Sequence, residues 1–211
     1  YAGPAFIQPL FNRFQALPEG ELRSQTLALS EKIGFRAQDV LVKDASRRSG
    51  HSNAYFTGIG PFKRIVFYDT MLSELTVKQN VGVLAHELGH WKLGHTLELK
   101  ALDLAARFHD LWMFNLALGW EPLCTAFGLP HNLQSTFVVY GFVAMQVFFW
   151  RWPLMTVLLR RQERDADKFA VATVGGGEPL AEALDRLCAQ NLADLPDHPR
   201  GDTRRRVHRH I

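Results

Sequence analysis

This chain has few cysteines and a small net charge, and each of these features excludes a class of protein or partner. Its two cysteines, Cys124 and Cys188, allow at most one disulfide in 211 residues, which excludes a disulfide scaffold. We expect both to be buried thiols in a reducing compartment. The 24 basic and 21 acidic side chains leave a net charge of +3, so we expect no nucleic-acid partner. A hydrophobic content of 47% excludes a wholly disordered chain.

No signal peptide is visible at the beginning of the given sequence. It opens at Tyr1, without the basic and apolar regions that such a peptide needs. We therefore expect the chain to be part of a longer protein.

The first third of the sequence predicts one helix and a small sheet. Residues 18–34 carry a rough apolar stripe and end at a glycine, which is typical of a helix. Three short runs rich in β-branched and aromatic residues predict strands at 40–42, 54–57 and 65–68. Residues 58–61 predict a hairpin loop between the last two strands, so we expect an antiparallel sheet.

A second helix is predicted from Thr76 to about Leu93. Thr76 is followed three residues later by Gln79, the spacing of a capping box. This helix carries the sequence His86-Glu87-Leu88-Gly89-His90.

The two histidines of this helix predict a zinc site. They are four residues apart, so both imidazoles leave the same face, and two neutral imidazoles suit Zn²⁺. The adjacent carboxylate of Glu87 can reach a metal-bound water and act as general base in peptide hydrolysis. The alternative is an amphipathic helix with two surface histidines. Apolar neighbours, including Leu84 and Trp91, favour a core helix and hence one bound zinc.

The third zinc ligand has two candidates. His95 lies about 140° round a helix from His90, so we expect it to be structural or at the surface. Glu163 and Asp167 are four residues apart on another predicted helix. Glu163 can ligate the metal while Asp167 accepts the free ring N–H of a ligating histidine. The alternative is that both acids lie on a solvated face.

A long uncharged segment predicts a membrane hairpin. No charged residue lies between Pro122 and Trp150, and residues 133–150 are dense in aromatic and β-branched side chains. A weaker apolar run at 111–129 and a turn at 128–132 complete two passes. Basic residues flank both ends, which places the flanks in the cytoplasm. The alternative is a buried helical hairpin of a soluble domain. Residues 156–173 and the segment from Glu178 to about Leu192 are then predicted helices.

Six segments together resemble the type I CAAX prenyl endopeptidases, which are integral-membrane zinc proteases. Residues 43–56 (KDASRRSGHSNAYF) resemble the block before that family's catalytic helix, and residues 63–70 (KRIVFYDT) match the next block. Residues 85–95 (AHELGHWKLGH) reproduce its zinc motif, and residues 163–170 (ERDADKFA) resemble its second acidic motif. Residues 9–12 resemble the cytoplasmic segment that follows its first membrane helices, and Asn191-Leu192 resembles the start of its late motif.

The resemblance implies a role for each site residue. His86, His90 and Glu163 would be the zinc ligands, Glu87 the base, and Asp167 the partner of His86. The substrates would be proteins that end in a prenylated C-a-a-X box and lose their last three residues. The protein would be an integral, multi-pass membrane protein with its protease core facing the cytoplasm, in contact with the lipid bilayer.

The expected fold is mainly α with a small antiparallel β-sheet, as a gluzincin-like zinc protease core plus a transmembrane helical hairpin. Residues 1–100 and 153–199 would form the two halves of the protease domain, and residues 101–152 the hairpin. Residues 200–211 would be a disordered basic tail. That tail stands where the family has an S-H-P-P-x-x-x-R-like element, and Asp197-His198-Pro199-Arg200 does not match it.

Two other functions fit part of the evidence. One is a quality-control protease like the HtpX group, with the same zinc chemistry on misfolded membrane proteins. The other is a zinc-binding membrane scaffold with impaired catalysis, although retention of Glu87 argues against it. For substrate binding, the candidate residues are Asn53, Ala54 and Tyr55, as an exposed strand edge to which a peptide adds. The alternative is an ordinary core strand.

Overall fold

The computed structural model describes residues 14–44, 46, 53–58 and 63–193. The chain forms two compact units, one of Tyr1–Leu88 with Phe169–Ile211 and the other of Gly89–Lys168. The predicted loop at 58–61 falls largely, and the basic tail entirely, outside the described residues. The predicted division of the chain into four domains stays a prediction.

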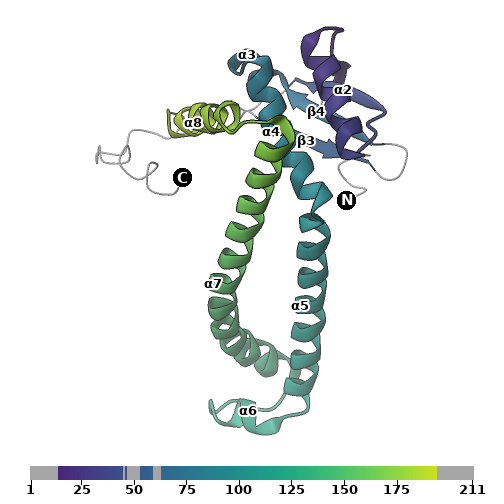
Figure 1. Cartoon of the computed structure of the whole chain (residues 1–211). Coiled ribbons are helices and arrows are strands. Elements are labelled where there is room, and N and C mark those ends of the chain that lie inside the picture. The colour runs from purple at the N-terminus through teal and green to yellow at the C-terminus, as the bar shows by residue number, and fades with distance from the viewer. Residues whose placement is uncertain (1–13, 45, 47–52, 59–62, 194–211) are drawn as a thin grey trace. The chain divides into compact units, whose positions relative to one another are not determined.

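The first unit contains a four-stranded sheet of strand order β1-β2-β4-β3 (Figure 1). The strands are β1 (Phe14–Ala16), β2 (Asp39–Lys43), β3 (Ala54–Thr57) and β4 (Arg64–Tyr68). The β1–β2 and β3–β4 pairs are antiparallel, whereas β2 and β4 are parallel. The sheet is therefore mixed, and the expectation of an antiparallel sheet is wrong for its central pair. Strand β1 was not expected.

The burial of β4 explains this topology. Its consecutive residues Ile65, Val66 and Phe67 are all buried, so both faces of the strand are covered. A strand covered on both faces belongs in the middle of a sheet. β4 therefore lies between β2 and β3, and β3 is left at the edge.

Helix α2 (Glu21–Ile33) confirms the first predicted helix, apart from its opening residues. It ends at Gly34, whose φ of 85° is a left-handed conformation that glycine adopts without strain. The short helix α3 (Asp69–Glu74) follows β4 directly and was not expected.

Helix α4 (Val77–Lys92) confirms the second predicted helix and its capping box. The backbone N–H of Thr76 donates to Gln79 Oε1 at 3.0 Å, and the N–H of Gln79 donates to Thr76 Oγ1 at 3.4 Å. Leu84, Ala85 and Leu88 are completely buried, so α4 is a core helix, as its apolar neighbours indicated.

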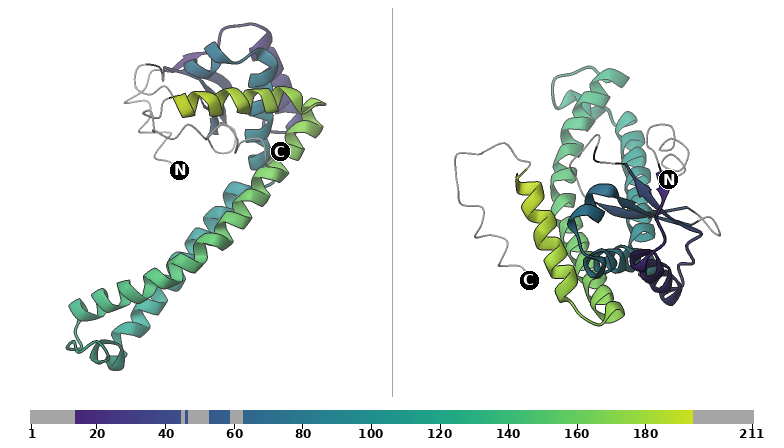
Figure 2. Two further views of the ribbon diagram at one scale, coloured as in Figure 1. Left: turned by 90° about the vertical axis from the view of Figure 1, so that its left-hand side faces the viewer. Right: turned by 90° about the horizontal axis from the view of Figure 1, so that it is seen from above.

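The second unit is built on two long helices that run side by side in both side views (Figures 1 and 2). Helix α5 (His95–Leu118) leads through the short α6 (Glu121–Thr125) into α7 (Leu133–Val174). The predicted first pass at 111–129 is wrong as a single helix, because α5 ends at Leu118 and α6 is a separate short helix. The predicted helices at 133–150 and 156–173 are one helix, which continues through Pro153.

Helices α5 and α7, the two arms of the hairpin, are joined by an ion pair between Asp110 of α5 and Arg151 of α7. All four oxygen–nitrogen distances between the carboxylate and the guanidinium are 2.9–3.1 Å. The hydroxyl of Tyr140 also donates to the Asp110 carbonyl at 2.9 Å. Such a fork-to-fork pair fixes the register of one arm against the other.

In the described part of the chain, α7 is the one helix long and apolar enough to cross a membrane. Only 6% of its apolar window is buried. A core helix of a soluble protein would bury most of such a window, so exposure favours the membrane interpretation.

Helix α8 (Glu178–Ala193) confirms the last predicted helix and packs closely on α4. A Cβ added at Gly82 would lie 3.3 Å from the backbone nitrogen of Leu180, so glycine permits this approach. Cys124 is buried, as expected, but Cys188 on α8 is exposed. The expectation of two buried thiols is therefore wrong for Cys188, which lies on the solvent-facing side of an amphipathic helix.

Candidate metal centre

Helix α4 carries both histidines of the candidate metal centre. His86 and His90 lie one turn apart and are both partly buried, while Leu84, Ala85 and Leu88 lie in the core. The helix is therefore anchored by its apolar face and directs its two imidazoles to one side. Glu87 follows His86 directly and is also partly buried.

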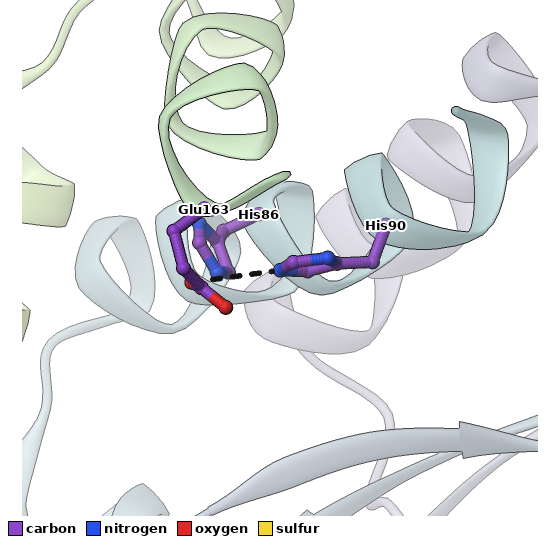
Figure 3. Close-up of side chains that lie close together, drawn as sticks. All are labelled: His86, His90 and Glu163. Atoms are coloured by element: carbon purple, nitrogen blue, oxygen red, sulfur yellow. Dashed lines mark ion pairs between the residues drawn. The ribbon is translucent and has the colours of Figure 1, made fainter. Parts of the chain in front are cut away.

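Helix α7 brings Glu163 to the same place. Its Oε2 lies 3.7 Å from His90 Nε2, and Figure 3 shows the three side chains converging. One potential ligand atom from each of His86, His90 and Glu163 lies within 4.8 Å of the others. Of the two candidates for the third ligand, Glu163 is the one that joins this cluster.

The cluster fits zinc by its donor set and its size. Zinc favours imidazole nitrogen and carboxylate oxygen at about 2.0–2.2 Å, which puts tetrahedral ligand atoms about 3.4 Å from one another. The 3.7 Å between His90 and Glu163 is close to that spacing. Three protein ligands leave a fourth position open, as in catalytic zinc sites.

Asp167 lies one turn after Glu163 on α7 and is partly buried. Between them Ala166 is completely buried, so this part of α7 is anchored like α4. The role of Asp167 as partner of His86 stays a prediction, as does the role of Glu87 as base.

His95 is buried and lies against His90. His95 is the first residue of α5, and its Nδ1 lies 3.0 Å from His90 Nδ1. His95 was expected to be structural or at the surface, and the structure places it in the interior, where it is 7% exposed. An angle of about 140° between His90 and His95 requires one continuous helix through both residues. In fact Gly94, with φ of 76°, separates α4 from α5, a break that a glycine after a helical last turn signals.

Helix α5 also contacts α7 at Gln162, the residue before Glu163. Gln162 is 3% exposed, and its Nε2 donates to Glu98 Oε2 at 2.7 Å. The first turn of α5 therefore contacts α4 through His95 and α7 through Glu98. Neither Gln162 nor Glu98 was singled out from the sequence, because a polar pair far apart in the chain leaves no local pattern.

The predicted substrate residues lie on the edge strand β3 and at its start. Asn53 is exposed, Ala54 is buried, and Tyr55 is partly buried. Asn53 Oδ1 accepts from the backbone N–H of Ala54 at 2.8 Å, so the amide NH₂ is the group it can offer to a peptide carbonyl. Burial, and then the neighbouring Tyr68, raise the pKa of Tyr55 to about 12, so its hydroxyl stays protonated.

The profile of peptidase family M48 matches residues 16–209 of this sequence. That is most of the chain. The chain belongs to peptidase family M48. The match runs through the basic tail in which the expected S-H-P-P-x-x-x-R-like element is missing.

Within family M48, the chain is similar to proteins named CAAX prenyl protease 1, which confirms the resemblance noted in the sequence. It is 41% identical to that protein of Saccharomyces cerevisiae over 220 residues, covering 93% of this chain and 47% of the relative. It is 32% identical to the human homolog over 227 residues, covering 89% of this chain and 48% of the relative. The chain thus spans about half the length of the curated relatives it matches.

The fold also matches a solved structure of this group. The crystal structure of Ste24p from S. mikatae aligns with a TM-score of 0.76 at 30% identity. The alignment covers 93% of this chain and 49% of that one. The mainly helical fold with a small sheet is therefore that of an M48 peptidase.

Proposed function

We propose that this chain forms the zinc-dependent catalytic centre of a CAAX-type prenyl protease. The observation that carries the proposal is the convergence of His86, His90 and Glu163 beside Glu87. The similarity to CAAX prenyl protease 1 supports the substrate class, a protein with a C-terminal, prenylated CAAX box.

His86, His90 and Glu163 would hold one zinc ion. Bound there, zinc would supply a Lewis acid that polarises the scissile carbonyl and lowers the pKa of a water molecule. Glu87 accepts the proton of the attacking water and returns it to the leaving amine. Asp167 holds the imidazole of His86 in the tautomer that frees the other ring nitrogen for the metal.

The membrane is the second proposed partner. The exposed apolar surface of α7 would lie in the bilayer, and α5 would complete a two-pass hairpin. Basic residues at both ends would keep the protease core on the cytoplasmic side. These are Lys92, Lys100 and Arg107 before the turn, and Arg151, Arg160, Arg161 and Arg164 after it.

The experiment uses the full-length protein that contains this chain, purified in detergent. A farnesylated CAAX peptide and its unprenylated counterpart are the substrates, and release of the last three residues is measured. Cleavage should stop when zinc is chelated and return when zinc is added. Glu163→Ala should lose both zinc and activity.

Asp165→Ala is the matched control, since Asp165 is an acid on the same helix that faces Arg161 and Lys168. It should keep zinc and activity. A protein that binds no zinc, or a Glu163→Ala variant with unchanged zinc affinity, would contradict the proposal. Cleavage of unfolded membrane proteins in place of CAAX peptides would favour the HtpX-like function.

A further inference from the structure

The two ring nitrogens of His90 face two different partners. Nε2 lies 3.7 Å from Glu163 Oε2, on the side of the candidate metal centre. Nδ1 lies 3.0 Å from Nδ1 of His95, and the two rings meet edge to face with centroids 5.1 Å apart. The ring of His90 is therefore held between the metal centre and a second imidazole.

This arrangement admits one set of tautomers when a metal is bound. A histidine that ligates through Nε2 needs a lone pair there, so a neutral His90 carries its proton on Nδ1. That proton points at Nδ1 of His95, which must then accept it. His95 consequently carries its own proton on Nε2. The opposite tautomer of His90 would place a proton on the nitrogen that faces Glu163 and would block ligation.

The location of His95 allows its ring to accept this hydrogen bond from His90. Its side chain is buried, and it stands on the first residue of α5 directly after the left-handed Gly94. The turn at Gly94 is what brings the ring back against His90, which a continued α4 would not do. The Gln162–Glu98 hydrogen bond fixes the same turn of α5 to α7 beside Glu163.

We propose that His95 is a positioning residue for the metal centre: by accepting the Nδ1–H of His90, it holds that ligand in the tautomer and ring orientation that zinc requires. This inference rests on the proposed function, because it assigns a role toward the same zinc. Partners of ligating histidines are more commonly carboxylates, backbone carbonyls or water, and their loss weakens metal binding by about 10–100-fold.

The test measures zinc affinity of the full-length protein by competition with a chromophoric chelator. His95→Leu fills the site with an apolar side chain of similar bulk but removes the acceptor, so the affinity of the protein for zinc should fall about 10–100-fold. His95→Asn should restore affinity to near that of the wild type, because Oδ1 of asparagine can stand where Nδ1 stood. His109→Leu is the matched control. It makes the same change on the same helix, where the ring faces Asp110, and should leave zinc affinity unchanged.

Cobalt substitution gives a second readout that does not depend on activity. The visible absorption of bound Co²⁺ reports the ligand geometry, so wild type and His95→Asn should share one spectrum. His95→Leu should differ from both.

A third variant keeps the test decisive if His95→Leu does not fold. His95→Gln places its oxygen farther from the backbone, near the position of Nε2, and should bind zinc at least tenfold more weakly than His95→Asn. Equal affinities in the asparagine and glutamine variants would overturn the inference. So would a folded His95→Leu variant with the affinity and cobalt spectrum of the wild type, and the proposed zinc site would then still stand. A wild-type protein that binds no zinc would overturn the proposed function itself.

Discussion

At the scale of single residues, the different roles proposed for Glu87 and Glu163 follow from where each side chain lies. Glu163 lies with the two imidazoles in a cluster whose potential ligand atoms are within 4.8 Å of one another, and its side chain is 58% exposed. Glu87 lies next to His86 on a helix whose other face is buried, so its carboxylate is partly shielded from water. Position therefore distinguishes the proposed ligand from the proposed base, although both are glutamates.

Glu87→Gln should separate zinc binding from catalysis. Glutamine is nearly isosteric but cannot accept a proton from the attacking water. We expect zinc affinity within about twofold of the wild type and a loss of turnover of at least about 10²-fold, the usual size of such a contribution. Zinc content and kcat on a farnesylated peptide are the measurements. Near-normal turnover in this variant would assign the base to another group.

At the scale of elements, the sequence predicted the features that depend on residues close together in the chain. The capping box at Thr76 and Gln79 was visible in the sequence because its partners are three residues apart, and it is formed. The parallel pairing of β2 with β4 was not visible, because it depends on which strand the rest of the core covers. The same holds for the contact of His95 with His90, which required the two helices to separate at Gly94.

The exposed edge of β3 carries a prediction about substrate binding. Among the strands that the structure describes, β3 pairs with β4 on one side only, and peptides commonly bind by adding a strand to such an edge. Asn53→Ala should lower kcat/KM about tenfold, the effect of losing one hydrogen bond of about 1.4 kcal/mol. Thermal stability should barely change.

Gln15→Ala is the control for this edge. Gln15 is an exposed amide side chain on β1, the strand at the opposite edge of the sheet, and its loss should leave kcat/KM unchanged. If Asn53→Ala lowers stability while activity per folded molecule stays intact, β3 is a structural strand and binds no substrate.

The contact between α5 and α7 beside Glu163 carries a further prediction. Glu98→Ala removes the acceptor of the Gln162 amide and leaves a buried donor unpaired, which costs about 1–3 kcal/mol locally. We expect zinc affinity to fall about three- to tenfold as Glu163 loses its support. Glu98→Gln keeps an oxygen acceptor and should bind zinc like the wild type. Equal zinc affinities in the alanine and glutamine variants would show that this contact does not position the ligand.

At the scale of the whole molecule, the first arm of the hairpin, α5, is the part predicted least well from the sequence. The apolar run predicted at 111–129 was weak because it contains Glu121 and because Asp110 stands directly before it. In the structure, the Asp110 carboxylate pairs with Arg151 of α7 at 2.9 Å. Asp103 and Arg107, which precede the run, pair with each other at 2.8 Å. The 24 residues of α5 extend about 36 Å at about 1.5 Å per residue, enough to cross a hydrocarbon core of about 30 Å.

The topology of the hairpin follows from this pairing and from the basic residues at its base. If α5 and α7 both cross the membrane, positions 100 and 160 lie on one side and the turn between the arms lies on the other. Lys100→Cys and Arg160→Cys, made in the full-length protein without Cys124 and Cys188, should be labelled by an impermeant thiol reagent from the cytoplasmic side. Phe127→Cys, an exposed position after α6, should be labelled only from the opposite side. Labelling of positions 100 and 160 from opposite sides would contradict the hairpin. Labelling of all three from the cytoplasmic side would instead place both arms outside the bilayer, and the exposed apolar surface of α7 would then have to be covered by protein.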